Sequence, residues 1–344
     1  MSDLKWINFF KPGSRVVAVP NWIKPELLFS VDNISNSFTV VRQFFNVYTL
    51  RGELRKIGVS LLAMLKMLRP IPVPGRKWKL EAFLKNVNMD VADVVLIVGK
   101  QTPIQKVKII LLDDRGDVVG FLKYAERIIA KMRLTHEYKI LSILPRDIAP
   151  RPIKLDTLYN GIGLLTSVIS GQKIKAVLPP APDVIKFMNR LVIEKNKSLD
   201  NHPWIQRLKT EKKFSYNEWL EPLCKLKWDV VIEHGDFVPW NLLETKDGSI
   251  KAVDWEFASL EGFPYIDIVY YILQIAALIK KWNPKRASLF AVNYLRQQFG
   301  FDLHVAASLV RLSAFEAYSI TAQNGRDDRW PLQRWRRAIW DACE

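Results

Sequence analysis

Three short apolar runs follow one another between residues 91 and 124, and polar or turn-forming residues end each of them. Short runs rich in Val, Ile and Leu, with turn signals at both ends, are typical of buried strands. The third run carries one charged residue near its end, Lys123. The pattern predicts strands over 91–98, 106–112 and 118–124, joined by turns at 99–105 and 113–116, and then a helix over about 125–144.

Two further apolar runs frame a polar loop in the second half of the chain. Residues 230–243 read Val-Val-Ile-Glu-His-Gly-Asp-Phe-Val-Pro-Trp-Asn-Leu-Leu, and residues 250–256 read Ile-Lys-Ala-Val-Asp-Trp-Glu. Before them, the apolar run over 162–171 predicts a buried strand that ends in a bend of small residues, and residues 172–228 alternate helical stretches with polar breaks. After them, residues 264–279 predict a strongly apolar helix.

The first 88 residues do not continue this pattern, and we predict that they form a separate N-terminal element with a short strand over Arg15–Val19. Apolar residues between 54 and 69 recur at helical spacing with basic residues among them, and Pro70 stops the run. A basic amphipathic helix can lie on an anionic membrane surface, or it can pack on a neighbouring part of the protein. The sequence leaves both interpretations open.

Length and composition limit the class of protein. A chain of 344 residues exceeds the size at which one core usually stops growing, so more than one packed unit is expected. Its two cysteines are too few and too far apart for a disulfide framework or a zinc site, which suits a reducing cytoplasm. The start of the chain lacks the layout of a signal peptide, and the longest apolar stretch is short for a bilayer span. We therefore predict no transmembrane helix.

The net charge of +16 is concentrated at the front of the chain, where residues 1–88 hold 14 Lys and Arg against 5 Asp and Glu. A basic field favours anionic partners, such as nucleotide phosphates, an acidic membrane surface or a phosphorylated substrate. Trp and Arg residues also gather over 330–340, but no recognised nucleic-acid-binding motif accompanies them. A packed terminal helix is the simpler interpretation of that segment, and nucleic acid is the weakest of the candidate partners.

The polar loop has the residue types and the spacing of a phosphoryl-transfer site. Magnesium bound to a nucleoside triphosphate prefers hard oxygen ligands, one or two of them from the protein, and Asn241 and Asp254 could supply these. The acceptor hydroxyl needs a carboxylate that orients it and takes its proton, and Asp236 suits that role. Five residues separate Asp236 from Asn241, as in the catalytic loop of protein kinases.

The motif His234-Gly-Asp236-x4-Asn241, followed by Asp254-Trp-Glu256, resembles the aminoglycoside phosphotransferase and choline kinase superfamily, whose members share the protein-kinase-like fold. The resemblance implies that Asp236 is the catalytic base and that Asn241 and Asp254 bind Mg²⁺. It assigns His234 to the support of the loop through hydrogen bonds. Glu256 would reach the metal through water or only stabilise its own loop.

The same resemblance implies a two-lobed α+β fold. Its parts are an antiparallel-sheet small lobe that binds the nucleotide, over 89–170, a mainly helical large lobe with the catalytic loop and the acceptor site, over 171–344, and a basic N-terminal extension, over 1–88.

The third predicted strand and the helix after it match the small lobe of this superfamily at two positions. Lys123 and Glu137 stand 14 residues apart, and a kinase-like lobe uses such a lysine, held by a helix glutamate, to contact the α- and β-phosphates of ATP. The alternative is a surface lysine and an unrelated glutamate. The turn before them has one glycine, Gly99, and departs from the glycine-rich loop of protein kinases, although its backbone amides could still cap phosphate oxygens.

The resemblance assigns further residues around the nucleotide. Leu243 and Val253 would supply apolar contacts beneath the purine ring, and Asp267, at the start of the apolar helix, would brace the catalytic loop. The bend at the end of the run over 162–171 corresponds to the hinge whose backbone groups hydrogen-bond the adenine. The hinge residues are Thr166, Ser167, Val168 and Ile169.

These features lead to one principal hypothesis, an ATP- and Mg²⁺-dependent kinase that transfers the γ-phosphoryl group to a hydroxyl of a small molecule. A sugar or a glycan precursor is the preferred acceptor, because a basic chain would slow the approach of a polycationic aminoglycoside. An aminoglycoside or amino-alcohol kinase is one alternative, and a catalytically weak kinase-like binding module is another. We expect a cytoplasmic protein, with peripheral contact to an anionic membrane through the N-terminal segment as an open alternative.

Overall fold

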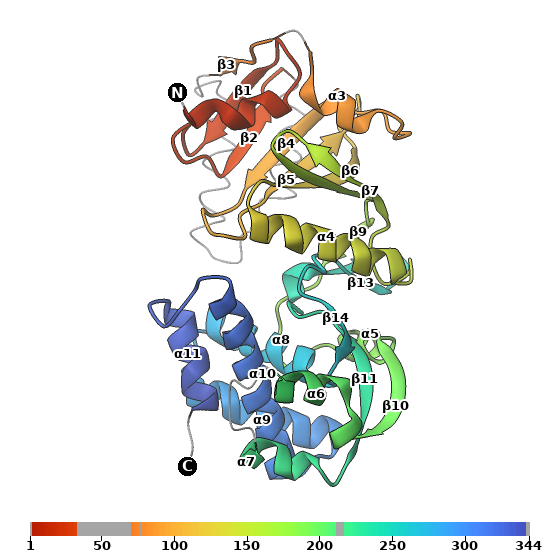
Figure 1. The fold of residues 1–344 in the computed structure, drawn as a ribbon, viewed down its shortest axis with the longest axis vertical. Helices are drawn as coiled ribbons and strands as arrows, with labels where there is room; N and C mark the ends of the chain where they lie inside the picture. Colours follow the sequence, from red (N-terminus) through yellow and green to blue (C-terminus); the bar gives the residue numbers. More distant parts are fainter. Residues whose placement is uncertain (1, 33–69, 76, 211–216, 342–344) are drawn as a thin grey trace. The chain divides into compact units, whose positions relative to one another are not determined.

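The computed structural model describes residues 2–32, 70–75, 77–210 and 217–341 (Figure 1). The chain divides into two compact units, one formed by Met1–Ser142 with Pro150–Val168 and the other by Ile143–Ala149 with Ile169–Glu344. The basic helix predicted between residues 54 and 69 lies outside the described residues.

Within the described residues, the first unit contains an eight-stranded antiparallel sheet with the order β3-β1-β2-β4-β5-β6-β8-β7. Strand β5 (Val107–Leu112) pairs with β4 (Asp93–Val98) on one side and with β6 (Val118–Ala125) on the other. Successive side chains of a strand point to opposite faces, and β5 is buried on both, since Ile109 joins one core and Ile110 the other. The three strands predicted from the apolar runs are confirmed to within two residues.

The N-terminal strands are part of this sheet and not a separate element, which corrects the boundary predicted at residue 88. Strands β1 (Arg15–Val19) and β2 (Leu27–Ser30) pair with each other, and β2 pairs with β4. The short β3 (Ile71–Pro72) continues the sheet beyond β1. Val16 and Val17 are buried in the two opposite cores, so the same two-sided burial that specifies β5 also specifies β1.

Residues before β1 and after β3 pack over one face of the sheet. Phe9 and Phe83 are buried in the same core as β5. Trp78 Nε1 donates a hydrogen bond to the Phe9 carbonyl at 2.8 Å, and the Tyr159 hydroxyl donates to the Asn8 carbonyl at 2.6 Å. The chain before β1 is thereby attached to the unit at two points. The helices are η1, a 3₁₀-helix over Ser2–Phe9, and α3, over Lys79–Leu84.

Helix α4 (Ile128–Ile143) packs Leu134 against Leu164 of the sheet. The helix predicted over 125–144 is confirmed and starts three residues later than expected, because β6 extends to Ala125. The strands that complete this side of the sheet are β7, over Pro152–Leu158, and β8, over Gly161–Thr166.

The second unit contains two three-stranded sheets within its described residues, β10-β11-β14 and β13-β12-β9. Strand β11 (Lys227–Glu233) leads into the polar loop, and β12 (Leu242–Thr245) and β13 (Ile250–Ala252) form the hairpin that follows it. The other strands are β9, over Gly171–Lys173, β10, over Val192–Ser198, and β14, over Ser259–Gly262.

Helices make up most of the rest of the second unit. The apolar α8 (Ile266–Leu278) is buried along most of its length, and α10 (Leu303–Gln323) packs against α8, α9 and α11. An antiparallel-sheet unit followed by a mainly helical unit confirms the predicted α+β fold class. The remaining helices are α5 (Pro182–Asn189), η2 (Leu199–Asn201), α6 (Pro203–Thr210), α7 (Asn217–Leu220), η3 (Glu221–Leu223), η4 (Pro239–Asn241), α9 (Pro284–Phe299) and α11 (Pro331–Trp340).

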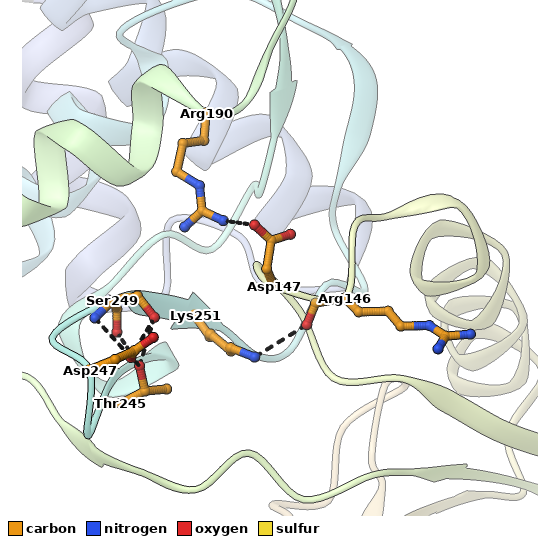
Figure 2. Close-up of polar contacts among 7 residues, drawn as sticks. All are labelled: Arg146, Asp147, Arg190, Thr245, Asp247, Ser249 and Lys251. Atoms are coloured by element: carbon orange, nitrogen blue, oxygen red, sulfur yellow. Dashed lines mark hydrogen bonds and ion pairs between the residues drawn. The ribbon is translucent and has the colours of Figure 1, made fainter.

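Residues 143–149 belong to the second unit because polar contacts hold them to its hairpin and to α5 (Figure 2). Lys251 of β13 donates from Nζ to the Arg146 carbonyl at 3.2 Å, and the Asp147 carboxylate forms an ion pair with Arg190, the residue after α5. Exposed contacts of this kind are individually weak, but together they fix the hairpin that leads into the candidate site. The turn of that hairpin is closed by Thr245, Asp247 and Ser249.

No helix in the described parts of the chain has both the length and the apolar content that crossing a bilayer requires.

Candidate active site

The polar loop begins where β11 ends, and a carboxylate from α8 holds it. Asp267 accepts two backbone N–H groups, from His234 with N to Oδ2 at 2.6 Å and from Gly235 with N to Oδ1 at 3.1 Å. Asp267 is the second residue of α8, so the helix fixes where its carboxylate lies. The two bonds connect successive residues of the loop to one side chain of α8, and this pair fixes the first turn of the loop.

The turn at Gly235 requires a glycine for two reasons. Its φ of 74° lies in the left-handed region, which residues with a Cβ adopt only at a cost. A Cβ at this position would also lie 2.5 Å from the Phe257 carbonyl oxygen. The glycine therefore allows a close backbone approach that no other residue permits.

His234 is fully buried and links the loop to the strand segment before Asp254. Its Nδ1 accepts the Asp236 backbone N–H at 3.2 Å, which requires that the ring proton sits on Nε2. Nε2 then donates to the Val253 carbonyl at 3.0 Å. Both ring nitrogens of His234 are thus hydrogen-bonded to backbone groups, which suits a residue that supports the loop.

Both carboxylate oxygens of Asp236 accept a hydrogen bond. The Tyr270 hydroxyl donates to Oδ1 at 2.9 Å, and Asn241 Nδ2 donates to Oδ2 at 3.0 Å and also to the Asp236 carbonyl at 3.0 Å. Tyr270 stands three residues after Asp267, so one helix positions both the support of the loop and the partner of its carboxylate. Asp236 is half-buried and held from two sides.

Negative charge gathers around Asp236. Burial raises the pKa of its carboxyl most, and the nearby carboxylates of Asp254 and Glu256 raise it further, while the hydrogen bonds from Tyr270 and Asn241 lower it. The balance raises the pKa of Asp236 to about 6. A carboxylate whose pKa lies near the working pH is well suited to act as a general base.

Asn241 and Asp254 carry the oxygen atoms that suit Mg²⁺. Asn241 turns its amide nitrogen toward Asp236, which leaves its Oδ1 directed elsewhere. Asp254 adopts a left-handed conformation with φ of 68°, which is uncommon outside glycine. Its charge adds to those of Asp236 and Glu256, and a divalent cation relieves such a concentration of negative charge.

The described residues include no set of three or more His, Cys, Asp and Glu side chains that could hold a metal ion by themselves. Magnesium in phosphoryl-transfer sites takes only one or two protein ligands and completes its shell with phosphate and water oxygens. The amide and carboxylate donors present here fit that use of the metal.

The first unit holds a buried ion pair between its sheet and its helix. Lys123 Nζ of β6 lies 2.5 Å from Glu137 Oε1 of α4, and the two side chains are only 10% and 2% exposed. The other carboxylate oxygen of Glu137, Oε2, is buried and has no hydrogen-bond partner among the residues that the structure describes. This geometry excludes the alternative of a surface lysine unrelated to Glu137.

In the turn between β4 and β5, both backbone groups of Gly99 are already hydrogen-bonded. The Gly99 N–H donates to the Lys106 carbonyl at 3.0 Å, and Gln105 Nε2 donates to the Gly99 carbonyl at 2.8 Å. A Cβ on Gly99 would lie 2.7 Å from the Lys106 carbonyl oxygen, so the glycine serves the close approach of the two strands. Its amide is therefore not available to cap a phosphate oxygen.

The predicted hinge spans the division between the two units, which falls between Val168 and Ile169. Thr166 is the last residue of β8, and its Oγ1 donates to the Phe121 carbonyl at 3.4 Å. Ser167 pairs with Arg151: its N–H donates to the Arg151 carbonyl, and its Oγ accepts the Arg151 N–H, both at 2.9 Å.

The two residues predicted beneath the purine lie in the second unit. Leu243 is in β12 and is half-buried, and Val253 directly follows β13. The Val253 N–H donates to the Asn241 carbonyl at 2.9 Å, and its carbonyl accepts from His234. Val253 therefore connects the catalytic loop to the hairpin.

Sequence reasoning missed Tyr270 and a group of three charged residues behind the loop, of which Glu233 is buried and Arg207 and Glu316 are partly exposed. Glu233, the last residue of β11, is fully buried near Glu316 of α10, and Arg207 of α6 lies 3.2 Å from Glu316. Burial and these like charges raise the pKa of Glu233 well above its usual value and that of Asp267 to about 7. No motif or regular spacing in the sequence links Arg207, Glu233 and Glu316. Tyr270 could have been found, because it stands three residues after Asp267 on a predicted helix.

Comparisons with known proteins give similarity only at the level of solved structures, since no family model and no curated protein matches the chain. Choline kinase LicA from Streptococcus pneumoniae is 15% identical, with a TM-score of 0.44 over 76% of this chain and 96% of its own. A thermostable mutant of the aminoglycoside phosphotransferase APH(4)-Ia, in a ternary complex with ADP and hygromycin B, is 12% identical, with a TM-score of 0.43 over 77% and 97%.

A third structure, WbdD with a kinase inhibitor, is 12% identical, with a TM-score of 0.30 over 69% of this chain and 49% of its own. The first two proteins are kinases of the superfamily that the sequence motifs resemble. Likeness at these identities and TM-scores says nothing of substrate or chemistry.

Proposed function

We propose that the protein is a kinase that transfers the γ-phosphoryl group of ATP to the hydroxyl group of a small molecule. The observation that carries this proposal is the Asp236 carboxylate, fixed by Tyr270 and Asn241 and close to the carboxylate of Asp254. The buried pair of Lys123 and Glu137 adds support, because kinase-like proteins contact ATP phosphates through a lysine held by a glutamate.

In this proposal Asp236 orients the acceptor and takes its proton. The acceptor oxygen forms a bond to the γ-phosphorus as the bond to the bridging oxygen breaks, ADP leaves, and the hydroxyl proton passes to Asp236. A pKa of about 6 keeps the carboxylate largely ionised at neutral pH, as a base requires. The hydrogen bonds from Tyr270 and Asn241 restrict its rotation, so an acceptor meets a carboxylate that is already oriented.

Asn241 and Asp254 would hold Mg²⁺ in this function, through the amide oxygen and the carboxylate. The ion, when bound with ATP, neutralises charge on the phosphates. Lys123 would contact the α- and β-phosphates, with Glu137 holding its ammonium group in place.

We infer a sugar or a glycan precursor as the acceptor in preference to a polycationic aminoglycoside. A net charge of +16 repels polycations and attracts anionic molecules, whereas it neither repels nor attracts a neutral sugar. An amino alcohol or an aminoglycoside is the alternative that an acceptor screen distinguishes.

The decisive experiment measures acceptor-dependent ADP release with Mg²⁺ and ATP across sugars, amino alcohols and aminoglycosides. The wild type is expected to release ADP with at least one acceptor, and Asp236→Asn to lose about 100-fold or more in turnover while it still binds ATP. Asp247→Asn, which changes an exposed carboxylate in the hairpin turn of the same unit, is the matched control. ATP binding without turnover of any acceptor would instead indicate a kinase-like binding module.

A further inference from the structure

Arg336 is a buried cation next to the candidate active site. It lies in α11, is only 5% exposed, and places its guanidinium carbon Cζ 5.8 Å from the ring centroid of Tyr270. The Tyr270 hydroxyl donates to the Asp236 carboxylate. One aromatic side chain therefore separates this positive charge from the residue proposed as the base.

The hydrogen bonds that the Arg336 side chain makes with the described residues all come from one of its three nitrogens. Nη1 donates to the Ala317 carbonyl at 3.1 Å, to Thr321 Oγ1 at 2.7 Å and to Gln333 Oε1 at 3.0 Å. These contacts fix the guanidinium against the end of α10. Nε is enclosed without an acceptor, and Nη2 has no hydrogen-bond partner among the described residues.

The Nε and Nη2 edge of the guanidinium, which donates to no acceptor among the described residues, has the geometry that binds an anion. Nε and Nη2 form a planar fork that can donate to two oxygens of one carboxylate or phosphate. The three acceptors on Nη1 are all neutral, and within the part of the chain that the structure describes no carboxylate contacts Arg336. Burial of a positive charge without a counter-ion is costly, and a ligand anion would offset that cost.

The neighbouring arginines of α11 differ from Arg336 in their exposure. Arg334 and Arg337 are exposed, and Arg337 forms ion pairs with Asp328 and Asp341. Surface arginines are expected to meet surface carboxylates in this way. Arg336 is the buried member of the group, and its charge faces the side of the unit that holds Tyr270.

We propose that Arg336 binds an anionic group of the acceptor molecule, either a carboxylate or a phosphate. The protein would then select acceptors that carry such a group near the hydroxyl that is phosphorylated. This inference rests on the proposed kinase function and narrows its acceptor. Tyr270 contacts both residues, so the acceptor would place its hydroxyl at Asp236 and its anion at Arg336, on either side of this side chain.

The test compares acceptors that differ only in the anionic group, namely glycerol, glycerate and glycerol 3-phosphate, and glucose, glucuronate and glucose 6-phosphate. The measured quantity is the ratio of kcat/KM for the anionic acceptor to kcat/KM for its neutral counterpart. We expect the wild type to prefer either the carboxylate acceptors or the phosphate acceptors over their neutral counterparts. Arg336→Gln should lower the kcat/KM ratio for the preferred anion about tenfold to a hundredfold, because a charge-assisted hydrogen bond is lost. Arg336→Lys, which keeps the charge but not the fork, should lie between them.

Arg334→Gln is the matched control, because it removes the same charge from an exposed position on the same helix. An unchanged ratio in both Arg336 variants overturns the proposal. An equal loss for neutral and anionic acceptors, together with lower thermal stability, assigns Arg336 to capping of α10 alone and overturns it as well. If Arg336→Gln does not fold, Arg336→Lys against the wild type carries the comparison.

A binding measurement separates this proposal from the kinase proposal. Thermal stabilisation by glycerate and by inorganic phosphate is recorded for the wild type, Arg336→Lys and Arg336→Gln. If no acceptor is turned over but an anion stabilises the wild type and not Arg336→Gln, the kinase proposal fails and the anion site stands. If each anion stabilises all three proteins equally, the anion site is overturned whatever the turnover.

Discussion

The candidate base depends on a tyrosine that no motif includes. Tyr270→Phe keeps the ring but removes the hydroxyl that donates to Asp236 at 2.9 Å. That hydrogen bond lowers the pKa of Asp236, so its loss raises the pKa. Because the base must be ionised, the acid limb of the pH–rate profile should move to higher pH, and kcat above the limb should fall about two- to tenfold. Steady-state kinetics over a pH series measure both effects.

Tyr271→Phe is the matched control for that change. Tyr271 is the next residue of the same helix, and its buried hydroxyl has no hydrogen-bond partner in the described parts of the chain. Its replacement is expected to leave the acid limb in place. A limb that does not move in Tyr270→Phe, or that moves equally in both variants, contradicts the role given to Tyr270.

Gly235 offers a second prediction for a single residue. Gly235→Ala combines a strained φ of 74° with a Cβ that lies 2.5 Å from the Phe257 carbonyl oxygen. We expect the free energy of unfolding to fall by about 2 to 5 kcal/mol, from backbone strain and crowding together. Gly248→Ala is the control, with a φ of 77° and no atom within 4 Å of the added Cβ, and it should lose only about 1 to 2 kcal/mol. Urea unfolding of both variants measures the difference. Equal losses of stability would mean that crowding against Phe257 does not contribute.

The sequence located the loop residues because their chemistry constrains their spacing along the chain. Asp236 and Asn241 are five residues apart and meet through one short turn. Tyr270 reaches Asp236 from 34 residues away, and Arg336 reaches Tyr270 from the last described helix. Contacts between distant segments depend on how helices pack, and a hydrophobic pattern does not specify that packing.

At the scale of elements, the pair formed by Lys123 and Glu137 connects β6 to α4 and can be tested for structure and function separately. Lys123→Met should lower stability by about 3 to 5 kcal/mol, because it leaves a buried carboxylate without its partner. Lys123→Met combined with Glu137→Leu should recover most of that loss, since two apolar side chains can fill the same space. ATP affinity, measured by calorimetry, should stay low in both variants if Lys123 contacts the phosphates.

Two outcomes would count against this view of the pair. ATP affinity that returns together with stability in the double variant would give Lys123 a structural role only. Full stability in Lys123→Met would mean that the pair does not hold the helix to the strand.

The strands that were predicted correctly share a physical property. β5 and β6 are buried over most of their residues and β4 over half of them, so each strand appears in the sequence as a largely apolar run. β9 consists of three exposed residues, and β3 has only two residues, one of them exposed, so neither has a hydrophobic pattern to recognise. Both exist because an adjacent strand offers free backbone groups, β12 for β9 and β1 for β3.

At the scale of the whole molecule, the boundary placed at residue 88 was wrong because a segment that does not continue the kinase-like pattern was treated as a separate element. Residues 1–88 lack that pattern and carry a basic excess, yet neither feature determines which strands pair. β2 pairs with β4 across more than sixty residues of sequence, and such long-range pairing leaves no local signal. The apolar residues of β1 and β2 were the better guide, since they are buried in the two cores of the sheet.

The corrected boundary makes a prediction about Phe9, which lies before the first strand. Its ring is 2% exposed and packs against Tyr124 and Tyr159, with centroids 5.0 and 4.9 Å away. Phe9→Ala should lower the free energy of unfolding by about 3 to 5 kcal/mol and speed amide hydrogen exchange in β6, because the cavity opens inside a shared core. Ile23→Ala changes a side chain that is 73% exposed and should alter stability by less than about 0.5 kcal/mol. If residues 1–88 were instead an independent extension, Phe9→Ala would leave the exchange of β6 at its wild-type rate.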